Sequence, residues 1–281
     1  MYDHPPELVT RLTRTAQEWR LRVLEMVYRV QTGHIGGSFS AAEIMACLYG
    51  HQLRVDPANP SWPDRDRFLL SKGHAVPILY VALAARGFIR AEELMQLRQL
   101  DSRLPGHPEP HVTPGVEVPA GPLGHGLALG CGMALAARMA KQRQRIYVLM
   151  GDGEINAGVV WEAAMLAAKY RLDNITAILD YNGVQQTGAT SDVMPTEPIA
   201  AKWQAFGWHT VEVHGHNVRQ VLDGLDLAAE VHARPTIVIA RTTKGKGVSF
   251  MEYNSVWHGK PPSEAEYLAA RAELEQGVAD A

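Results

Sequence analysis

The sequence predicts an α/β fold in which a doubly wound, mostly parallel sheet carries helices on both faces. Short runs rich in Val, Ile and Leu alternate with longer segments of helical periodicity. These runs are continuously apolar, which is typical of parallel strands buried on both faces. Polar or glycine-rich turns follow the runs, at the sheet edge where ligands of such folds bind.

The composition predicts one large domain over residues 1–281, with a core over about 7–260. Hydrophobic residues make up 46% and charged residues 20%, which is ordinary for a globular protein. We expect neither a transmembrane helix nor a secretory signal, and Cys47 and Cys131 favour neither a disulfide framework nor a zinc site. We therefore expect a cytoplasmic protein. Its net charge of −3 argues against binding to nucleic acid or to a membrane.

At the N-terminal end, apolar spacing predicts an amphipathic helix over residues 7–30 and a glycine-rich turn over 33–37. Ser40 followed by Glu43 has the spacing of a capping box. This pattern predicts a helix that Ser40 caps and that ends near His51.

Residues 67–70 form the next predicted strand, and the segment 71–74 opens a helix after it. Residues 101–123 are rich in Pro, Gly and His, which predicts a long loop. A loop of this length inside a compact domain is usually functional.

The second half of the chain alternates regularly between predicted helices and strands. The predicted strands are 145–150, 174–180, 209–214 and 235–241. The predicted helices are 124–142, 158–171, 217–232 and 263–276.

Two polar turns at the ends of neighbouring strands carry the strongest chemical signal. Gly151-Asp152-Gly153 ends one strand, and Asn182 follows the next. Because the interval has room for one helix and one strand, a right-handed crossover would bring Asp152 and Asn182 to the same sheet edge. With the backbone carbonyl of Val184 they offer three hard oxygens to Mg²⁺, or to Ca²⁺ or Mn²⁺. Gly151-Asp152-Gly153 alone is a weak signal that is more typical of a plain tight turn, whereas its combination with Asn182 favours a metal-assisted diphosphate site.

This combination resembles the cofactor signature of thiamine diphosphate enzymes, and further motifs narrow the resemblance to transketolase. These motifs are Gly33-His34-Ile35-Gly36-Gly37-Ser38, Ser71-Lys72-Gly73-His74-Ala75, Leu104-Pro105-Gly106-His107-Pro108-Glu109, Gly121-Pro122-Leu123-Gly124-His125-Gly126, Lys244-Gly245-Lys246-Gly247 and Val256-Trp257-His258-Gly259-Lys260. They run from about residue 30 to 260. The chain is similar in particular to the N-terminal, diphosphate-binding subunit of a split, two-chain transketolase.

The resemblance implies a role for individual residues around the cofactor. Asp152, Asn182 and the carbonyl of Val184 match the metal ligands. The other residues matched to thiamine diphosphate binding are His74, Gly121, Leu123, Gly151, Gly153, Glu154, Lys244 and His258.

Three of the twelve histidines match residues that face the substrate: His34, His107 and His258. Histidine suits proton transfer near neutral pH. The histidines outside the cofactor and substrate motifs are expected to be structural or without a matching role, and they include His111, His214 and His216.

The implied activity is transfer of a two-carbon ketol unit from a ketose or ketose phosphate to an aldose or aldose phosphate, as in the pentose phosphate route. In the family, a pyrimidine-binding C-terminal part carries the catalytic glutamate, and residues 260–281 are too few to hold it. We therefore expect the chain to be inactive alone and to need a separate partner chain, in an α2β2 heterotetramer. The donor and acceptor sugars are left open, including sulfosugars and branched sugars.

Two positions depart from the usual transketolase pattern. Ala157 stands where many relatives carry a glutamate of the subunit interface, and Glu154 is a hypothetical partial substitute. His125 stands where single-chain transketolases usually carry Gln, as in the split type. The alanine-rich faces of helices 124–140 and 158–168 suit either a subunit interface or packing within the chain.

Three other interpretations are weaker. A nicotinamide-dependent oxidoreductase would use the glycines at 124–126 and Asp152, but the third glycine of the dinucleotide fingerprint is missing. A non-catalytic remnant would not be expected to keep the metal ligands and loop histidines. A metal hydrolase built on His107 and His111 lacks a helix with an adjacent glutamate.

Overall fold

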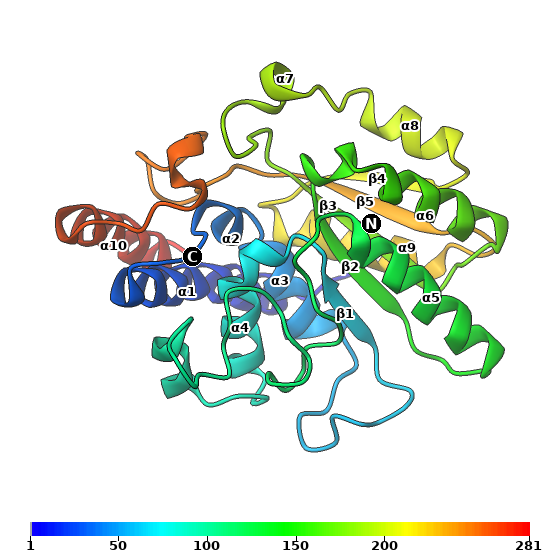
Figure 1. Ribbon diagram of the computed structural model, residues 1–281, viewed down its shortest axis with the longest axis horizontal. Helices are drawn as coiled ribbons and strands as arrows, with labels where there is room; N and C mark the ends of the chain where they lie inside the picture. The colour runs from blue at the N-terminus through cyan, green and yellow to red at the C-terminus, as the bar shows by residue number, and fades with distance from the viewer. Residues whose placement is uncertain (1) are drawn as a thin grey trace.

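The computed structural model describes residues 2–281 and shows a five-stranded sheet between two layers of helices (Figure 1). The strands are β1 (Arg67–Leu70), β2 (Ile146–Gly151), β3 (Ile175–Tyr181), β4 (His209–His214) and β5 (Thr236–Arg241). Their order is β1-β2-β3-β5-β4, and every neighbouring pair is parallel. The predicted fold class is confirmed.

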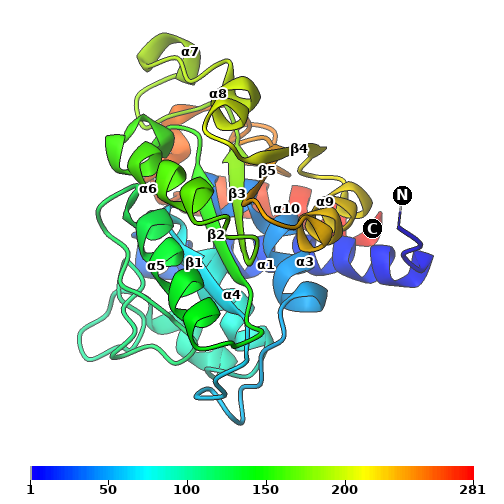
Figure 2. The same ribbon diagram turned by 90° about the vertical axis from the view of Figure 1, so that its right-hand side faces the viewer.

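Helices cover both faces of the sheet (Figure 2), and each face has its own hydrophobic core. The helices on one face are α5 (His125–Met139), α6 (Gly158–Lys169) and α8 (Ile199–Ala205). Those on the other face are α1 (Pro6–Val30), α3 (Ala42–Cys47), α4 (Val76–Ala85) and α9 (Val218–Glu230). Val148 belongs to the first core and its neighbour Leu149 to the second. Alternate residues of β2, β3 and β5 thus face opposite cores, which explains why these strands are almost continuously apolar. The edge strand β4 contributes only to the second core, and Val213 is its one buried residue.

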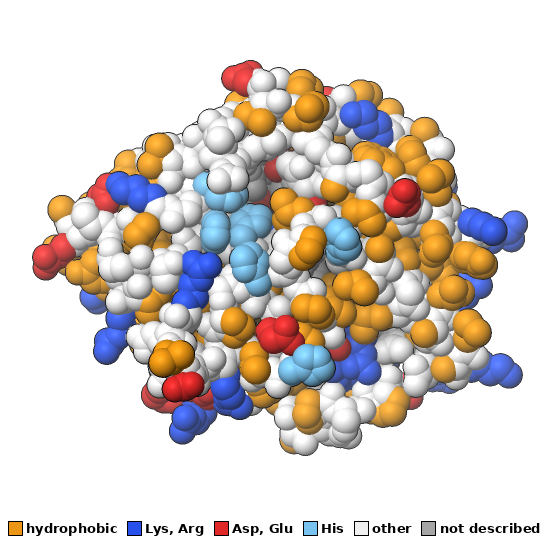
Figure 3. Space-filling model, in the orientation of Figure 1, with side chains coloured by type: hydrophobic (Ala, Val, Ile, Leu, Met, Phe, Trp, Pro, Cys, Tyr) orange, Lys and Arg blue, Asp and Glu red, His pale blue; other side chains and the backbone are white. Residues whose placement is uncertain are grey.

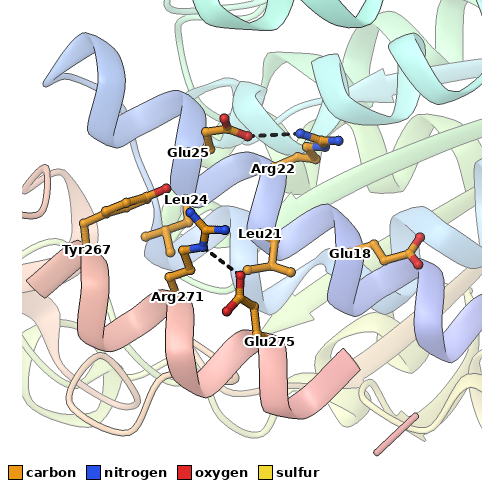
Figure 4. Close-up of a pocket in the computed structure, with 8 residues that line it drawn as sticks. All are labelled: Glu18, Leu21, Arg22, Leu24, Glu25, Tyr267, Arg271 and Glu275. Atoms are coloured by element: carbon orange, nitrogen blue, oxygen red, sulfur yellow. Dashed lines mark hydrogen bonds and ion pairs between the residues drawn. The ribbon is translucent and has the colours of Figure 1, made fainter. Parts of the chain in front are cut away.

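The C-terminal helix α10 (Glu264–Ala279) packs against α1, and the rings of Tyr28 and Tyr267 stack with centroids 4.0 Å apart. Ser263 caps α10 in a capping box with Glu266. Figure 4 shows the groove between α1 and α10. Ion pairs within each helix line it: Arg22 with Glu25, and Arg271 with Glu275. No predicted site residue lines this groove.

The segment around Ser40 differs from the prediction. The expected turn at 33–37 continues into a short helix, α2 (Gly36–Ser40), and the Ser40 hydroxyl donates to the buried Oδ2 of Asp180 at 2.5 Å. The carboxylate of Glu43 binds Arg20 and His216 instead of a helix amide. The capping-box prediction was therefore wrong, because charged tertiary partners replace the backbone groups. The helix predicted to run to His51 is α3, which begins at Ala42 and passes into a π-helical turn at Leu48–Gln52.

The other predicted helices and strands are present, with ends shifted by a few residues. The predicted loop 101–123 contains no helix or strand. The short elements missed by the sequence analysis are α2, α7 (Thr190–Val193), α8 and 3₁₀ turns at Gly73–Ala75, Ala91–Gln96, Glu154–Asn156 and Ser255–His258. Within residues 2–281, no helix has both the length and the apolar composition to span a membrane.

Candidate functional site

The site lies at the carboxyl ends of the strands. Gly151 of β2 pairs in register with Asp180 of β3, so the turns that follow these strands are neighbours, as the crossover argument predicts. A cavity of about 350 Å³ opens there. Its walls contain every residue predicted to bind cofactor: His74, Gly121, Leu123, Gly151, Asp152, Gly153, Glu154, Asn182, Val184, Lys244 and His258.

Four further cavity residues were not singled out from the sequence: Gly37, Lys72, Gln185 and Gln186. Gly37 and Lys72 lie inside two of the transketolase motifs, so the sequence could have indicated that they line the site. Gln185 and Gln186 follow the turn after β3, and no spacing rule marked them.

Asp152 is a buried carboxylate, 3% exposed, without an ion-pair partner among the described residues. Its Oδ2 accepts hydrogen bonds from the amide of Gly183 at 2.9 Å and the hydroxyl of Thr190 at 3.0 Å. Burial and the neighbouring charge of Asp180 raise the pKa of Asp152. Because an unpaired buried carboxylate is unfavourable, a bound cation would stabilise this arrangement.

The oxygens beside Asp152 suit a hard cation. Oδ1 of Asn182 accepts from the amide of Val184 at 3.2 Å, and the Val184 carbonyl accepts from Nζ of Lys244 at 3.0 Å. Residues 2–281 contain no cluster of three or more His, Cys, Asp or Glu side chains able to hold a metal. A metal here would therefore depend on one carboxylate together with amide and backbone oxygens, which is a donor set that Mg²⁺ accepts.

A buried ion pair joins Lys72, just after β1, to Asp180 at the end of β3. The Lys72 ammonium also donates to the carbonyl of Gly37 at 2.8 Å. Burial opposes ionisation of Asp180, but the charge of Lys72 keeps its pKa below the usual range. This pair fixes three separate segments of the cavity wall relative to one another.

Glu154 ties together three loops at the sheet edge. Its carboxylate accepts from the hydroxyl of Ser71, from the amide of Gly124 at 2.7 Å and from the amide of Gly151 at 3.0 Å. It is 3% exposed, and both oxygens are engaged within the chain. The hypothesis that Glu154 partly substitutes at a subunit interface for the glutamate missing at Ala157 stays a prediction, and the structure shows the carboxylate bound within this chain.

Three predicted histidines form a cluster. The ring of His34 lies 5.2 Å from those of His74 and His258, which stack on each other at 5.0 Å. Burial, helped by the charge of Arg98, lowers the pKa of His34 to about 4. Burial and Lys244 lower the pKa of His258 to about 3. Both imidazoles are thus neutral at pH 7 and can accept a proton or a hydrogen bond.

His107 is exposed on the long loop, outside the stacked cluster. Burial of part of its ring and the charge of Arg98 lower its pKa. The charge of His107 also helps to lower the pKa of His34, so the two histidines lie near the same region of the site. The candidate substrate histidines therefore divide into a partly buried cluster and one residue at the rim.

Comparison with known proteins identifies the family of this chain. Residues 12–278 match the family described as "Transketolase, thiamine diphosphate binding domain". The chain belongs to the transketolase family. It is 41% identical over 265 residues to the 6-deoxy-6-sulfo-D-fructose transketolase subunit of Clostridium sp. (strain MSTE9), covering 94% of this chain and 96% of that protein. It is 42% identical over 270 residues to an apulose-4-phosphate transketolase subunit of Phocaeicola vulgatus, covering 96% of each.

The solved structure of transketolase from Campylobacter jejuni superposes with a TM-score of 0.89 at 32% identity. The alignment covers 94% of this chain but only 43% of that transketolase. The predicted family, the thiamine diphosphate cofactor and the transferase class are confirmed. The chain spans less than half of this transketolase and nearly all of the two relatives named as subunits.

One histidine outside the transketolase motifs has a defined structural role. Nε2 of His216 accepts a hydrogen bond from the amide of Thr243 at 2.8 Å. Nδ1 of the same ring lies 2.9 Å from the carboxylate of Glu43. It thereby connects the start of α3 to the loop after β5. The preferred structural interpretation of His216 is confirmed.

The alanine-rich helices α5 and α6 pack against each other within the chain. Alanines of both helices are buried in the core beneath them: Ala134, Ala137, Ala163, Ala164 and Ala167. Their outer surface is also apolar (Figure 3). Its large exposed side chains are Leu129, Met139, Met165, Leu166 and Tyr170, which we call the α5–α6 surface.

Proposed function

We propose that this chain is the N-terminal subunit of a two-chain transketolase. It would transfer a two-carbon ketol unit from a ketose or ketose phosphate to an aldose or aldose phosphate. The supporting observation is that one cavity gathers all the residues expected to bind cofactor, with neutral histidines beside it. The relatives from Clostridium and Phocaeicola are named as transketolase subunits, and this chain aligns with nearly their whole length.

In this proposal Asp152, Asn182 and the Val184 carbonyl hold Mg²⁺, or Ca²⁺ or Mn²⁺ in its place. The metal would bind the diphosphate, and Lys244 and His74 would contact it from the cavity wall. Bound thiamine diphosphate supplies the electron sink for cleavage of the bond beside the ketose carbonyl. The glycines at 151 and 153 let the backbone approach the cofactor closely.

His34, His107 and His258 serve the substrate in this proposal. Cleavage beside the carbonyl requires removal of a proton from the C3 hydroxyl, and a neutral imidazole can accept it. The lowered pKa values of His34 and His258 keep both rings neutral at pH 7. His107, at the rim, would hydrogen-bond a substrate oxygen.

The proposal includes a partner subunit that binds the pyrimidine ring and carries the catalytic glutamate, in an α2β2 assembly. The α5–α6 surface is apolar and exposed, as expected of a surface that a partner covers. We place the enzyme in the cytoplasm, where its two buried cysteines would remain free thiols.

The test is co-expression with the neighbouring reading frame, if it encodes a pyrimidine-binding chain of similar size, followed by a ketol-transfer assay with thiamine diphosphate and Mg²⁺. Activity is expected only when both chains are present. Robust transfer by this chain alone would overturn the two-chain proposal. An assembled but inactive pair that binds cofactor would favour the non-catalytic alternative, and stabilisation by NAD rather than thiamine diphosphate would favour the oxidoreductase.

A further inference from the structure

Lys244 engages one ring nitrogen of His258 inside the candidate site. Its Nζ lies 2.8 Å from Nδ1 of His258. The same ammonium donates to the carbonyls of Val184 at 3.0 Å and Gln185 at 3.4 Å. The side chain is buried, and a Cβ placed on Gly36 would lie 3.1 Å from its Cγ and 3.3 Å from its Cε. The stem of Lys244 is therefore packed against a glycine, which fixes the position of the ammonium.

These three contacts determine which nitrogen of His258 carries the proton. An ammonium group has three hydrogens and no lone pair, so each of its partners must accept a hydrogen bond. The two carbonyls are acceptors by nature, and Nδ1 must then be the unprotonated nitrogen of the neutral ring, with the proton on Nε2. Turning the ring over would place a carbon opposite the ammonium and lose a charge-assisted hydrogen bond.

The second nitrogen of His258 is available to a ligand. Nε2 has no hydrogen-bond partner within residues 2–281, and the ring lines the cavity described above. Stacking on His74 at 5.0 Å and an edge contact with His34 at 5.2 Å hold the plane of the ring. Burial and then the charge of Lys244 lower the pKa of His258 to about 3, which agrees with a ring that stays neutral. A neutral ring with its Nδ1 occupied offers the ligand only an N–H group.

We propose that Lys244 is a positioning residue that holds His258 in the Nε2–H tautomer. His258 then donates a hydrogen bond to an oxygen of the bound ligand and does not accept the proton of the substrate's C3 hydroxyl. This inference rests on the proposed function. The proton passes to another ring, and His34 suits this step because neither of its ring nitrogens has a hydrogen-bond partner in the described part of the chain.

Binding of a diphosphate is compatible with this hydrogen bond. The contact of Lys244 with the Gln185 carbonyl is the longest of the three, at 3.4 Å. A phosphate oxygen is also an acceptor and can take this donor, while Nδ1 of His258 keeps its own. The tautomer should therefore be the same with and without thiamine diphosphate.

The other lysine of the same motif is the matched control. Lys246 lies two residues further along the chain and does not line the cavity. Its ammonium pairs with the carboxylate of Glu252 at 3.1 Å, and this carboxylate also accepts from the amide of Gly247. Lys246 thus stabilises the turn, whereas Lys244 contacts a histidine of the site.

The first experiment determines the tautomer by ¹⁵N NMR of the chain labelled in its histidine rings, with and without thiamine diphosphate and Mg²⁺. The His258 signals, assigned by their absence in His258→Gln, should show an attached proton on Nε2 and none on Nδ1. Lys244→Met should populate the Nδ1–H tautomer as well, and Lys246→Met should leave the signals unchanged. A proton on Nδ1 in the unmodified chain, or an unchanged tautomer in Lys244→Met, would overturn the proposal.

The second experiment uses the reconstituted two-chain enzyme to distinguish a hydrogen-bond donor from a base. A Gln amide in place of the imidazole still donates a hydrogen bond but takes up no proton. His258→Gln should therefore keep kcat within about 10-fold, whereas His34→Gln should lower it by at least about 100-fold, as expected for loss of a general base. An equally large loss in His258→Gln would contradict the assigned donor. If the unmodified enzyme transfers no ketol unit, the proposed function fails, and the NMR result decides the tautomer by itself.

Discussion

The imidazole rings of His74 and His258 stack with their centroids 5.0 Å apart and an interplanar angle of 26°. His74 follows β1 at one edge of the sheet, whereas His258 lies in the long segment after β5. Their contact therefore forms only when the whole sheet is assembled. The site depends on tertiary folding more than on any single motif.

Asp152→Asn should abolish the thermal stabilisation produced by thiamine diphosphate and Mg²⁺ together. A ligand present at about 100 times its Kd stabilises a protein by about 2.7 kcal/mol. The melting temperature of the unmodified chain should therefore rise by several degrees when thiamine diphosphate and Mg²⁺ are both added at such concentrations. The variant should show no such shift in a thermal melt, because the amide lacks the charge that attracts the metal. Asp192→Asn, on an exposed acidic residue, is the control. An unchanged shift in Asp152→Asn would contradict the assigned metal ligand.

Glu154→Gln should destabilise the fold without added ligand. The carboxylate accepts three hydrogen bonds. In the variant, the side-chain NH₂ group of Gln would face a group that is itself a hydrogen-bond donor. We expect a loss of about 2–4 kcal/mol in the free energy of unfolding, measured by urea denaturation. Glu162→Gln, on the exposed face of α6, should change it by less than about 0.5 kcal/mol. Equal stability of the two variants would show that the three-loop contact is unimportant.

Glu43 should make the stability of the chain sensitive to acid. Burial opposes its ionisation, yet Arg20 and His216 hold its pKa at about 2, against an ordinary value of 4.5. The folded state therefore favours the charged carboxylate. Its stabilising contribution is complete above about pH 4.5 and is lost as the pH falls toward 2. Urea unfolding across this range should show a smaller pH dependence for Glu43→Gln, and parallel curves would contradict the ion-pair interpretation.

His34 should titrate well below an ordinary histidine. Burial, then the charges of Arg98 and His107, lower its pKa to about 4 from 6.5. Because the folded state favours the neutral ring, the associated stability is full above about pH 6.5 and falls as the pH drops toward 4. NMR titration of the His34 ring, assigned by comparison with His34→Gln, should give a midpoint near 4. The same ring in urea-unfolded chain should titrate near 6.5. A folded-state midpoint near 6.5 would exclude a desolvated ring.

The juxtaposition of Asp152 and Asn182 could be predicted because topology alone brings the two residues together. Asp152 and Asn182 follow neighbouring parallel strands, and the crossover rule places such ends side by side. Ser40 and Glu43 were misinterpreted because their partners, Asp180 and Arg20, are remote in sequence. Local patterns describe local hydrogen bonds, and a buried charge elsewhere can replace them.

The α5–α6 surface has a consequence for how the protein is made. Leu129, Met139 and Met165 are exposed at 42%, 79% and 55%, and apolar surface of this extent promotes aggregation when nothing covers it. If the proposed two-chain assembly forms, chain synthesised in excess of its partner would precipitate or be degraded. Matched production of the two chains would then be a condition for keeping this protein in solution, before any question of catalysis arises.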